Sequence, residues 1–203
     1  MNANAYQLFI SLRSPFARRI RLAMHRLKLD YSEKVVDVFQ ENPELFKANP
    51  LGMVPTLVTP DAGTLCDSLN ILDYLDEKTH RIWSSDFATR IQQKQAAAIA
   101  AGLMQSTVLY FQEAKMHEVP SAIWMKDHLE TLERTLKHLS QLPSSVWTSG
   151  GELTQAAWDL SAGLEYLSLR FPEIEWKNTY PVFTPVLSLA RKNAYFLETE
   201  PKL

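Results

Sequence analysis

Cysteine is almost absent from this chain of 203 residues, and its scarcity excludes two kinds of structure. With Cys66 alone, no disulfide can form within the chain, and no pair of cysteines can begin a zinc site. The five histidines show no metal-ligand spacing beside carboxylates or cysteine, so we expect no metal cofactor. Cys66 itself is expected to be a small buried hydrophobe rather than a redox centre.

Long apolar runs and a strong net charge are also missing. No run reaches the roughly 18 residues that a membrane helix needs. The N-terminus has neither a charged region before its apolar stretch nor a small-residue cleavage site after it. These absences predict a reduced, cytoplasmic compartment and no membrane partner. The formal charge of -2 argues against nucleic acid as a partner, because phosphate binding needs a basic excess.

One local basic cluster does occur, between residues 18 and 28, where four arginines and a lysine gather. Such a run is usually the solvated side of a helix, which is the interpretation that we favour. A basic binding face has the same composition, so the sequence leaves that alternative open.

The first 80 residues alternate between short apolar runs and helical patterns. Strands are expected at residues 6–12, 31–39, 54–59 and 64–66, and helices at 15–28 and 68–77. Ser14 is a good N-cap type, and Pro15 suits the first helical position, where its missing N–H costs nothing. A βαβ unit followed by a hairpin and a closing helix predicts a small α/β sheet domain.

Beyond about residue 86 the pattern becomes helical. Helices are expected around residues 88–111, 125–142, 160–167 and 185–191. In the second of these segments, leucines spaced three and four apart form one apolar stripe that faces a core. The chain is long enough for one large domain or two small ones. The change of pattern predicts two, at residues 1–80 and 88–203, with a linker at 81–87.

Three segments of the first domain resemble motifs of the glutathione transferase family. Residues 14–21, SPFARRIR, resemble the start of the first helix in the omega and tau classes, where Cys or Ser precedes Pro-Phe. Residues 49–57, NPLGMVPTL, resemble the loop before the family's third strand. Residues 67–75, DSLNILDYL, resemble the segment that opens its third helix. The resemblance implies an α/β thioredoxin-like N-terminal domain that binds glutathione, followed by an all-α C-terminal domain.

A helix that begins at Ser14-Pro15 has chemistry that suits a bound thiol. A thiol with a pKa of about 8.5 is only a few per cent ionised at neutral pH, and the thiolate is the nucleophile. Lowering that pKa by two units requires about 2.7 kcal/mol of preferential stabilisation of the anion. The positive end of the helix and the Ser14 hydroxyl can both supply it. The resemblance implies that Ser14 is the catalytic residue beside the sulfur and that Phe16 belongs to the glutathione site. The alternative is that Ser14 is only an N-cap.

The resemblance also implies the other contacts with glutathione. A cis peptide bond before Pro55 would turn the Val54 backbone outward to pair with the cysteinyl backbone. Ser68 would receive the γ-glutamyl carboxylate, and Asp67 would face the ammonium group. Asp67 and Ser68 can also be read as a simple helix cap.

The sequence departs from the family pattern at three places. No Tyr or Cys stands in the activating position, since Arg13 and Ser14 occupy that stretch and Tyr6 lies at the other end of the strand. Asp67 replaces the commoner Glu and is one methylene shorter. Thr154 is expected to cap the central helix of the second domain, but Ala157 replaces the acidic residue that would complete a capping box.

These features favour a glutathione transferase that activates the thiol of glutathione for attack on a small hydrophobic electrophile. Met104, Tyr110 and Phe111 are candidates for the acceptor site, although such residues at helical spacing also fit a core. The alternatives are a non-catalytic binding or regulatory protein of the same fold, or a glutathione-dependent reductase or isomerase. The absence of Cys at position 14 disfavours a reductase. The family resemblance further implies a homodimer.

Overall fold

Four strands form one mixed sheet in the first part of the chain, as seen in a computed structural model that describes residues 6–201. β1 (Tyr6–Ile10) pairs in parallel with β2 (Tyr31–Val35) and antiparallel with β3 (Thr56–Val58). β3 pairs in turn with the antiparallel edge strand β4 (Thr64–Cys66). The strand order is therefore β2-β1-β3-β4. This is the βαβ unit and hairpin that the sequence predicts, with β2 ending four residues earlier than expected.

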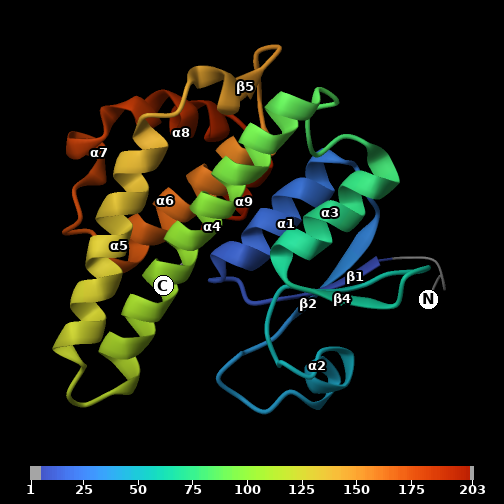
Figure 1. Ribbon diagram of the computed structural model, residues 1–203. Coiled ribbons are helices and arrows are strands. Elements are labelled where there is room, and N and C mark those ends of the chain that lie inside the picture. The colour runs from blue at the N-terminus through green and yellow to red at the C-terminus, as the bar shows by residue number, and fades with distance from the viewer. Residues whose placement is uncertain (1–5, 202–203) are drawn as a thin grey trace. The chain divides into compact units, whose positions relative to one another are not determined.

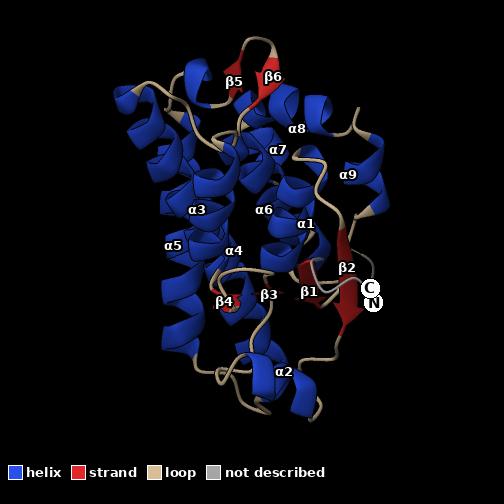
Figure 2. Cartoon of the chain, turned by 90° about the vertical axis from the view of Figure 1, so that its right-hand side faces the viewer, coloured by secondary structure: helices blue, strands red, loops and turns tan. Residues whose placement is uncertain are grey.

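Helices cover both faces of this sheet. α1 (Pro15–Arg26) and α3 (Ser68–Thr79) lie side by side on one face, and α2 (Pro43–Ala48) lies on the other (Figures 1 and 2). The apolar side chains of α1 and α3, among them Ile20, Met24 and Leu72, are fully buried. The thioredoxin-like arrangement predicted for this part of the chain is confirmed.

The second part of the chain is built mainly from helices. Its elements are α4 (Phe87–Met116), α5 (Ala122–Ser140), α6 (Gln155–Arg170), α7 (Trp176–Thr179), α8 (Thr184–Ala190) and α9 (Ala194–Glu198). α4 packs against both α5 and α6. A two-strand hairpin, β5 (Thr148–Ser149) and β6 (Glu152–Leu153), adds a feature that the sequence analysis missed. Its Gly-Gly turn has positive φ at both central residues, which glycine adopts at no steric cost.

Helix α6 is buried along most of its length, including its polar side chains. Thr154 caps it, as predicted: its hydroxyl accepts a hydrogen bond from the Ala157 N–H at 3.3 Å and donates one to the Val146 carbonyl at 2.6 Å. Gln155, the next residue, donates one turn along the helix to Asp159 at 2.7 Å, and both side chains are fully buried. These bonds satisfy polar groups that would otherwise destabilise a buried helix.

The contacts divide the chain into two compact units, one ending at Ile82 and the other running from Trp83 to Pro201. The segment between α3 and α4 covers residues 80–86, and Asp86 caps α4 by accepting from the Thr89 N–H. Across residues 6–201, no helix combines the length and the apolar character needed to cross a bilayer.

Candidate functional site

The sheet register gathers three of the predicted segments at one edge of the first unit. Phe9 on β1 lies opposite Thr56 on β3, and Thr56 lies opposite Cys66 on β4, so the three residues form one row across the sheet. From this row the chain continues out of β1 toward Ser14. It reaches β3 directly after Val54 and Pro55, and it continues out of β4 into Asp67 and Ser68. The strand directions therefore bring these residues to the same edge, although they are distant in sequence.

Ser14 is the N-cap of α1. Its Oγ accepts a hydrogen bond from the Ala17 N–H at 3.1 Å, and Pro15 occupies the first helical position, as predicted. A serine hydroxyl has one donor in addition to its acceptor lone pairs. Within residues 6–201, no acceptor is recorded for the Ser14 O–H, so capping leaves this donor available to a ligand. Phe16, two residues further on, is half-buried.

The Val54–Pro55 peptide bond is cis, which confirms the expectation drawn from the family resemblance. The loop before it is held by Asn49, whose buried side-chain amide donates to the Met53 carbonyl at 3.1 Å and to the Thr56 hydroxyl at 2.9 Å. No described residue is recorded as a hydrogen-bond partner of the Val54 backbone N–H or C=O. Both groups can therefore pair with an extended peptide.

Asp67 and Ser68 form the start of α3. Asp67 has a φ of 68°, a left-handed conformation that is uncommon outside glycine and recurs at functional sites. Its Oδ1 accepts from the Leu69 and Asn70 N–H groups at 2.8 and 3.3 Å, so the capping interpretation is confirmed for Asp67. Ser68 is buried, and its N–H has no acceptor inside the helix because it is the first helical residue.

The interpretation of the basic cluster as a solvated helix face is wrong for Arg18 and Arg19. Both side chains are buried, and Arg19 Nη1 donates to Ser68 Oγ at 3.0 Å. Adjacent residues on a helix project about 100° apart, so a run of arginines spreads around the helix and part of it faces the packed side. Arg21 pairs with Glu33 on β2 at 2.7 Å. The sequence analysis therefore missed Arg19 as a neighbour of the candidate site.

A second polar cluster lies at the opposite end of β1, and Tyr6 belongs to it. The Tyr6 hydroxyl is 3.4 Å from that of Tyr74, which donates to Asp61 at 2.5 Å, and Lys78 forms an ion pair with Asp61. Hydrogen bonds from Lys78 and Tyr74 lower the pKa of Asp61, whereas burial and the bond to Asp61 raise the pKa of the Tyr74 hydroxyl. This cluster ties the β3–β4 hairpin to α3 and lies away from Ser14.

The remaining predicted residues occupy different environments. Cys66 is half-buried rather than fully buried. Met104 is fully buried on α4, and the ring of Tyr110 packs edge-on against Phe171, 4.5 Å between centroids. The Phe111 ring lies 3.8 Å from the Arg170 guanidinium, within cation–π range. Met104 therefore has the core position that its helical spacing also allowed.

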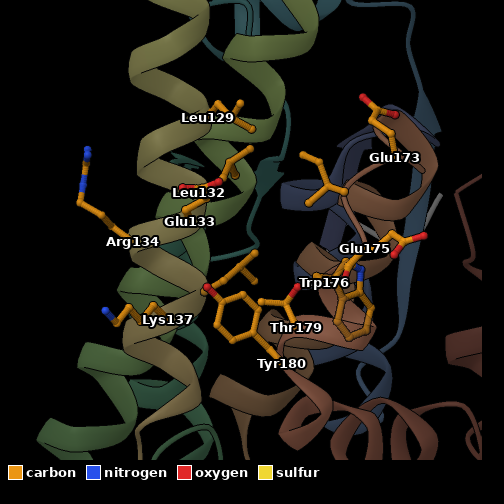
Figure 3. Close-up of a pocket in the computed structure, with 12 residues that line it drawn as sticks. Leu129, Leu132, Glu133, Arg134, Lys137, Glu173, Glu175, Trp176, Thr179 and Tyr180 are labelled. Carbon is orange, nitrogen blue, oxygen red and sulfur yellow. Dashed lines mark hydrogen bonds between the residues drawn. The ribbon is translucent and has the colours of Figure 1, made fainter.

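The helical unit contains a cavity of about 470 Å³ between α5 and residues 173–180 (Figure 3). Leu129, Leu132 and Trp176 give it an apolar lining, and the Tyr180 side chain reaches toward α5. Its volume lies within the range of small-molecule sites. None of the three candidate acceptor residues lines it.

Comparison with known proteins identifies the family to which the chain belongs. The pattern that defines the glutathione S-transferase N-terminal domain matches residues 13–78. Glutathione S-transferase 1 from Dianthus caryophyllus is 33% identical over 156 residues, which cover 72% of this chain and 70% of that protein. The chain belongs to the glutathione S-transferase family.

Two further proteins are similar to this glutathione S-transferase family member. The structure of a glutathione S-transferase from Methylobacillus flagellatus, with glutathione bound, is 27% identical and has a TM-score of 0.88. The match covers 98% of this chain and 100% of that one. Maleylacetoacetate isomerase maiA from Aspergillus fumigatus is 24% identical over 165 residues, or 73% of this chain and 71% of that protein.

Proposed function

We propose that this chain binds glutathione at the sheet edge described above and activates its thiol for attack on a small hydrophobic electrophile. The observation that carries the proposal is the gathering of Ser14, Val54 and Ser68 at one edge, each with a donor or acceptor to spare. The Val54 backbone pairs with the cysteinyl peptide, and Ser68 receives the γ-glutamyl carboxylate. Asp67 faces the ammonium group, and Phe16 lies at the second position of α1, beside Ser14.

Ser14 is assigned to the sulfur. Its hydroxyl lies at the N-terminus of a 12-residue helix, where the helix dipole also favours an anion, and the described residues 6–201 offer no recorded acceptor for its O–H. A hydrogen bond to the thiolate stabilises the ionised form preferentially and lowers the pKa of the thiol. The Ser-Pro-Phe start of this helix, which resembles that of the omega and tau classes, supports the assignment. Tyr110 and Phe111 remain proposals for the acceptor wall, and Met104 is the weakest of the three because it is fully buried.

A second candidate function is glutathione-dependent isomerisation, favoured by the similarity to a maleylacetoacetate isomerase. It uses the same thiolate but regenerates glutathione at the end of each cycle. The two functions are separated by following glutathione during turnover: a transferase consumes it stoichiometrically, and an isomerase does not. A non-catalytic protein would bind glutathione without any turnover.

The direct test of the proposal is calorimetry with reduced glutathione. We expect saturable heat and a rise in the unfolding temperature as the ligand concentration increases, because a ligand that binds only the folded state stabilises it. The absence of both at ligand concentrations on the order of 10 mM would end the enzyme proposal.

We further propose a cytoplasmic homodimer. The family resemblance supports the assembly, and sedimentation velocity at micromolar protein tests it. A single species of about twice the 23.2 kDa chain mass is expected. A monomer would contradict the assembly and leave the glutathione site of each chain unaffected.

A further inference from the structure

The cavity of the helical unit lies between a leucine ridge and an aromatic wall. The ridge consists of Leu129, Leu132 and Leu136, spaced three and four apart on α5, and the last two of these are almost fully buried. The wall opposite consists of Trp176 and Tyr180 (Figure 3). The cavity of about 470 Å³ is therefore bounded by large apolar side chains on both sides.

Contacts behind the aromatic wall hold it in place. The indole N–H of Trp176 donates to Ser168 Oγ at 2.8 Å, and Trp176 is only 2% exposed. Phe183 is fully buried, and its ring centroid lies 6.4 Å from that of Trp176 and 6.0 Å from that of Tyr180. Both distances are in the range of favourable aromatic pairs. A ligand would meet a surface that is already ordered, which lowers the entropic cost of binding.

Two hydroxyl groups belong to the lining, and they differ in their partners. Thr179 donates to the Glu175 carbonyl at 3.3 Å. The Tyr180 side chain reaches toward α5 in Figure 3, and residues 6–201 contain no recorded hydrogen-bond partner for its hydroxyl. A phenolic hydroxyl both donates and accepts. The wall therefore offers one hydrogen bond to an alcohol or carbonyl group of a ligand.

The charges around the cavity favour a ligand without charge. The Lys177 ammonium lies 5.6 Å from the Trp176 ring centroid, so a cation at this ring would meet a charge of the same sign. Figure 3 shows the side chains of Arg134 and Lys137 pointing away from the aromatic wall, so an anion would face neither of these lining cations. Three carboxylates also belong to the lining, those of Glu133, Glu173 and Glu175. An uncharged molecule avoids the cost of burying an ion without a partner.

We propose that this cavity is a second binding site, for an uncharged, flat aromatic molecule that carries one hydroxyl or carbonyl group. The rings lie between the leucine ridge and Trp176, where they gain apolar burial and aromatic contact. The oxygen of the ligand bonds to the Tyr180 hydroxyl. None of the residues proposed for glutathione or for the acceptor lines this cavity. The inference therefore goes beyond the proposed function and does not depend on it.

The experiment is equilibrium dialysis of 2-naphthalenemethanol against the full-length protein. The parent should bind this alcohol with a dissociation constant on the order of 10–100 µM, which suits a well-buried ligand of its size. Leu129→Trp places an indole in the cavity and should weaken binding roughly tenfold or more, because a close-packed site has no room for both ring systems. Ile123→Trp is the matched control: it adds the same side chain to α5 at a position that is 84% exposed and outside the lining, and should bind as the parent does.

Matched probes test the chemistry of the ligand. 2-Methylnaphthalene has the same rings as the alcohol but lacks the hydroxyl. Tyr180→Phe should weaken binding of the alcohol roughly three- to tenfold, the range of a neutral hydrogen bond, and binding of the hydrocarbon less than about twofold. 2-Naphthoate and 2-naphthylmethylammonium carry a negative and a positive charge on the same rings. Both should bind the parent at least roughly tenfold more weakly than the alcohol does.

Each result has a defined meaning. A parent that does not bind the alcohol, or undiminished binding in folded Leu129→Trp, overturns the inference. So does a charged probe that binds as tightly as the alcohol, or an equal response of alcohol and hydrocarbon to Tyr180→Phe. If Leu129→Trp does not fold, the charged probes and Tyr180→Phe decide the matter by these criteria.

A last variant separates this cavity from the candidate acceptor site. Tyr110→Leu removes a ring from that site and should bind the alcohol as the parent does. If Tyr110→Leu loses the alcohol and Leu129→Trp keeps it, the probe occupies the acceptor site and the inference is overturned. Calorimetry with glutathione tests the proposed function independently, so either conclusion can fail while the other stands.

Discussion

Helices α1 and α6 both begin at a hydroxyl side chain, yet the two caps differ in what they leave unused. Thr154, in the helical unit, is buried and engages its hydroxyl fully, accepting from Ala157 and donating to Val146. Ser14, in the α/β unit, is half-exposed and accepts from Ala17, with no acceptor recorded for its O–H along the described chain. The same capping chemistry therefore serves packing in one unit and leaves a donor for a ligand in the other.

The two units differ in the same way beyond their caps. In the helical unit, buried polar side chains such as Gln155 and Asp159 bond to each other within one helix. In the α/β unit, polar groups at the ends of β1, β3 and β4 keep spare hydrogen-bonding capacity at a shared edge. Unsatisfied capacity at an element end, rather than the mere presence of a polar residue, thus marks the candidate site.

The largest expected effect is on turnover, when the Ser14 hydroxyl is removed. Ser14→Ala should lower turnover roughly ten- to a hundredfold, since a hydrogen bond to a charged group contributes about 1.5–3 kcal/mol. The affinity for glutathione should stay nearly unchanged because Val54 and Ser68 provide separate contacts. Steady-state kinetics and calorimetry on the same preparation measure both. A loss of affinity that equals the loss of turnover would contradict the assignment of Ser14 to the sulfur.

Ser14→Cys provides an independent check on the same position. A thiol at a helix N-terminus has a depressed pKa, and its thiolate attacks oxidised glutathione to form a mixed disulfide while one glutathione thiolate leaves. Mass spectrometry should show one adduct on this variant that the half-buried Cys66 of the parent does not give. Equal modification of the parent, or none of the variant, means that position 14 does not face the sulfur.

The second-largest effect concerns Thr154, the cap of α6, whose hydroxyl is fully engaged in hydrogen bonds. Thr154→Val keeps the shape of the side chain but leaves the buried Ala157 N–H and Val146 carbonyl without their partner, and should lower the free energy of unfolding by about 2 kcal/mol. Urea unfolding measures the loss, and Thr154→Ser, which keeps the hydroxyl, should recover most of it. Turnover per folded molecule should equal that of the parent. Reduced turnover in folded Thr154→Val would break the distinction between the two caps.

The smallest effect is a pH dependence of the exposed Asp61 cluster. Lys78 and Tyr74 lower the pKa of Asp61 in the folded state, so its contribution to stability is complete above the ordinary carboxyl pKa of about 3.9. That contribution is lost as the pH falls through the lowered folded value. Thermal unfolding between about pH 3 and pH 6 should show the parent and Asp61→Asn converging at the acid end. Parallel curves would mean that Asp61 contributes nothing through its charge.

The sequence alone determined the parts of this protein that depend on local chemistry. The 3.6-residue period, the Ser14 and Thr154 caps and the alternation of short strands come from side chains that are close in the chain. The motifs around Val54-Pro55 and Asp67-Ser68 indicated the family. The resemblance to that family in turn predicted the cis peptide bond before Pro55. Turn residues at Gly150-Gly151 also held a readable signal for the hairpin that was missed.

Only the tertiary structure decided which polar groups face one another. The row Phe9–Thr56–Cys66 depends on strand register, which is a long-range property. The burial of Arg19 against Ser68 depends on how α1 packs beside α3, across 49 positions of sequence. From the sequence alone, a run of arginines is read as solvent-exposed, because composition does not show which of the side chains point into the core. The packing of two helices on one sheet face supplies that information, and with it the residue behind the candidate carboxylate site.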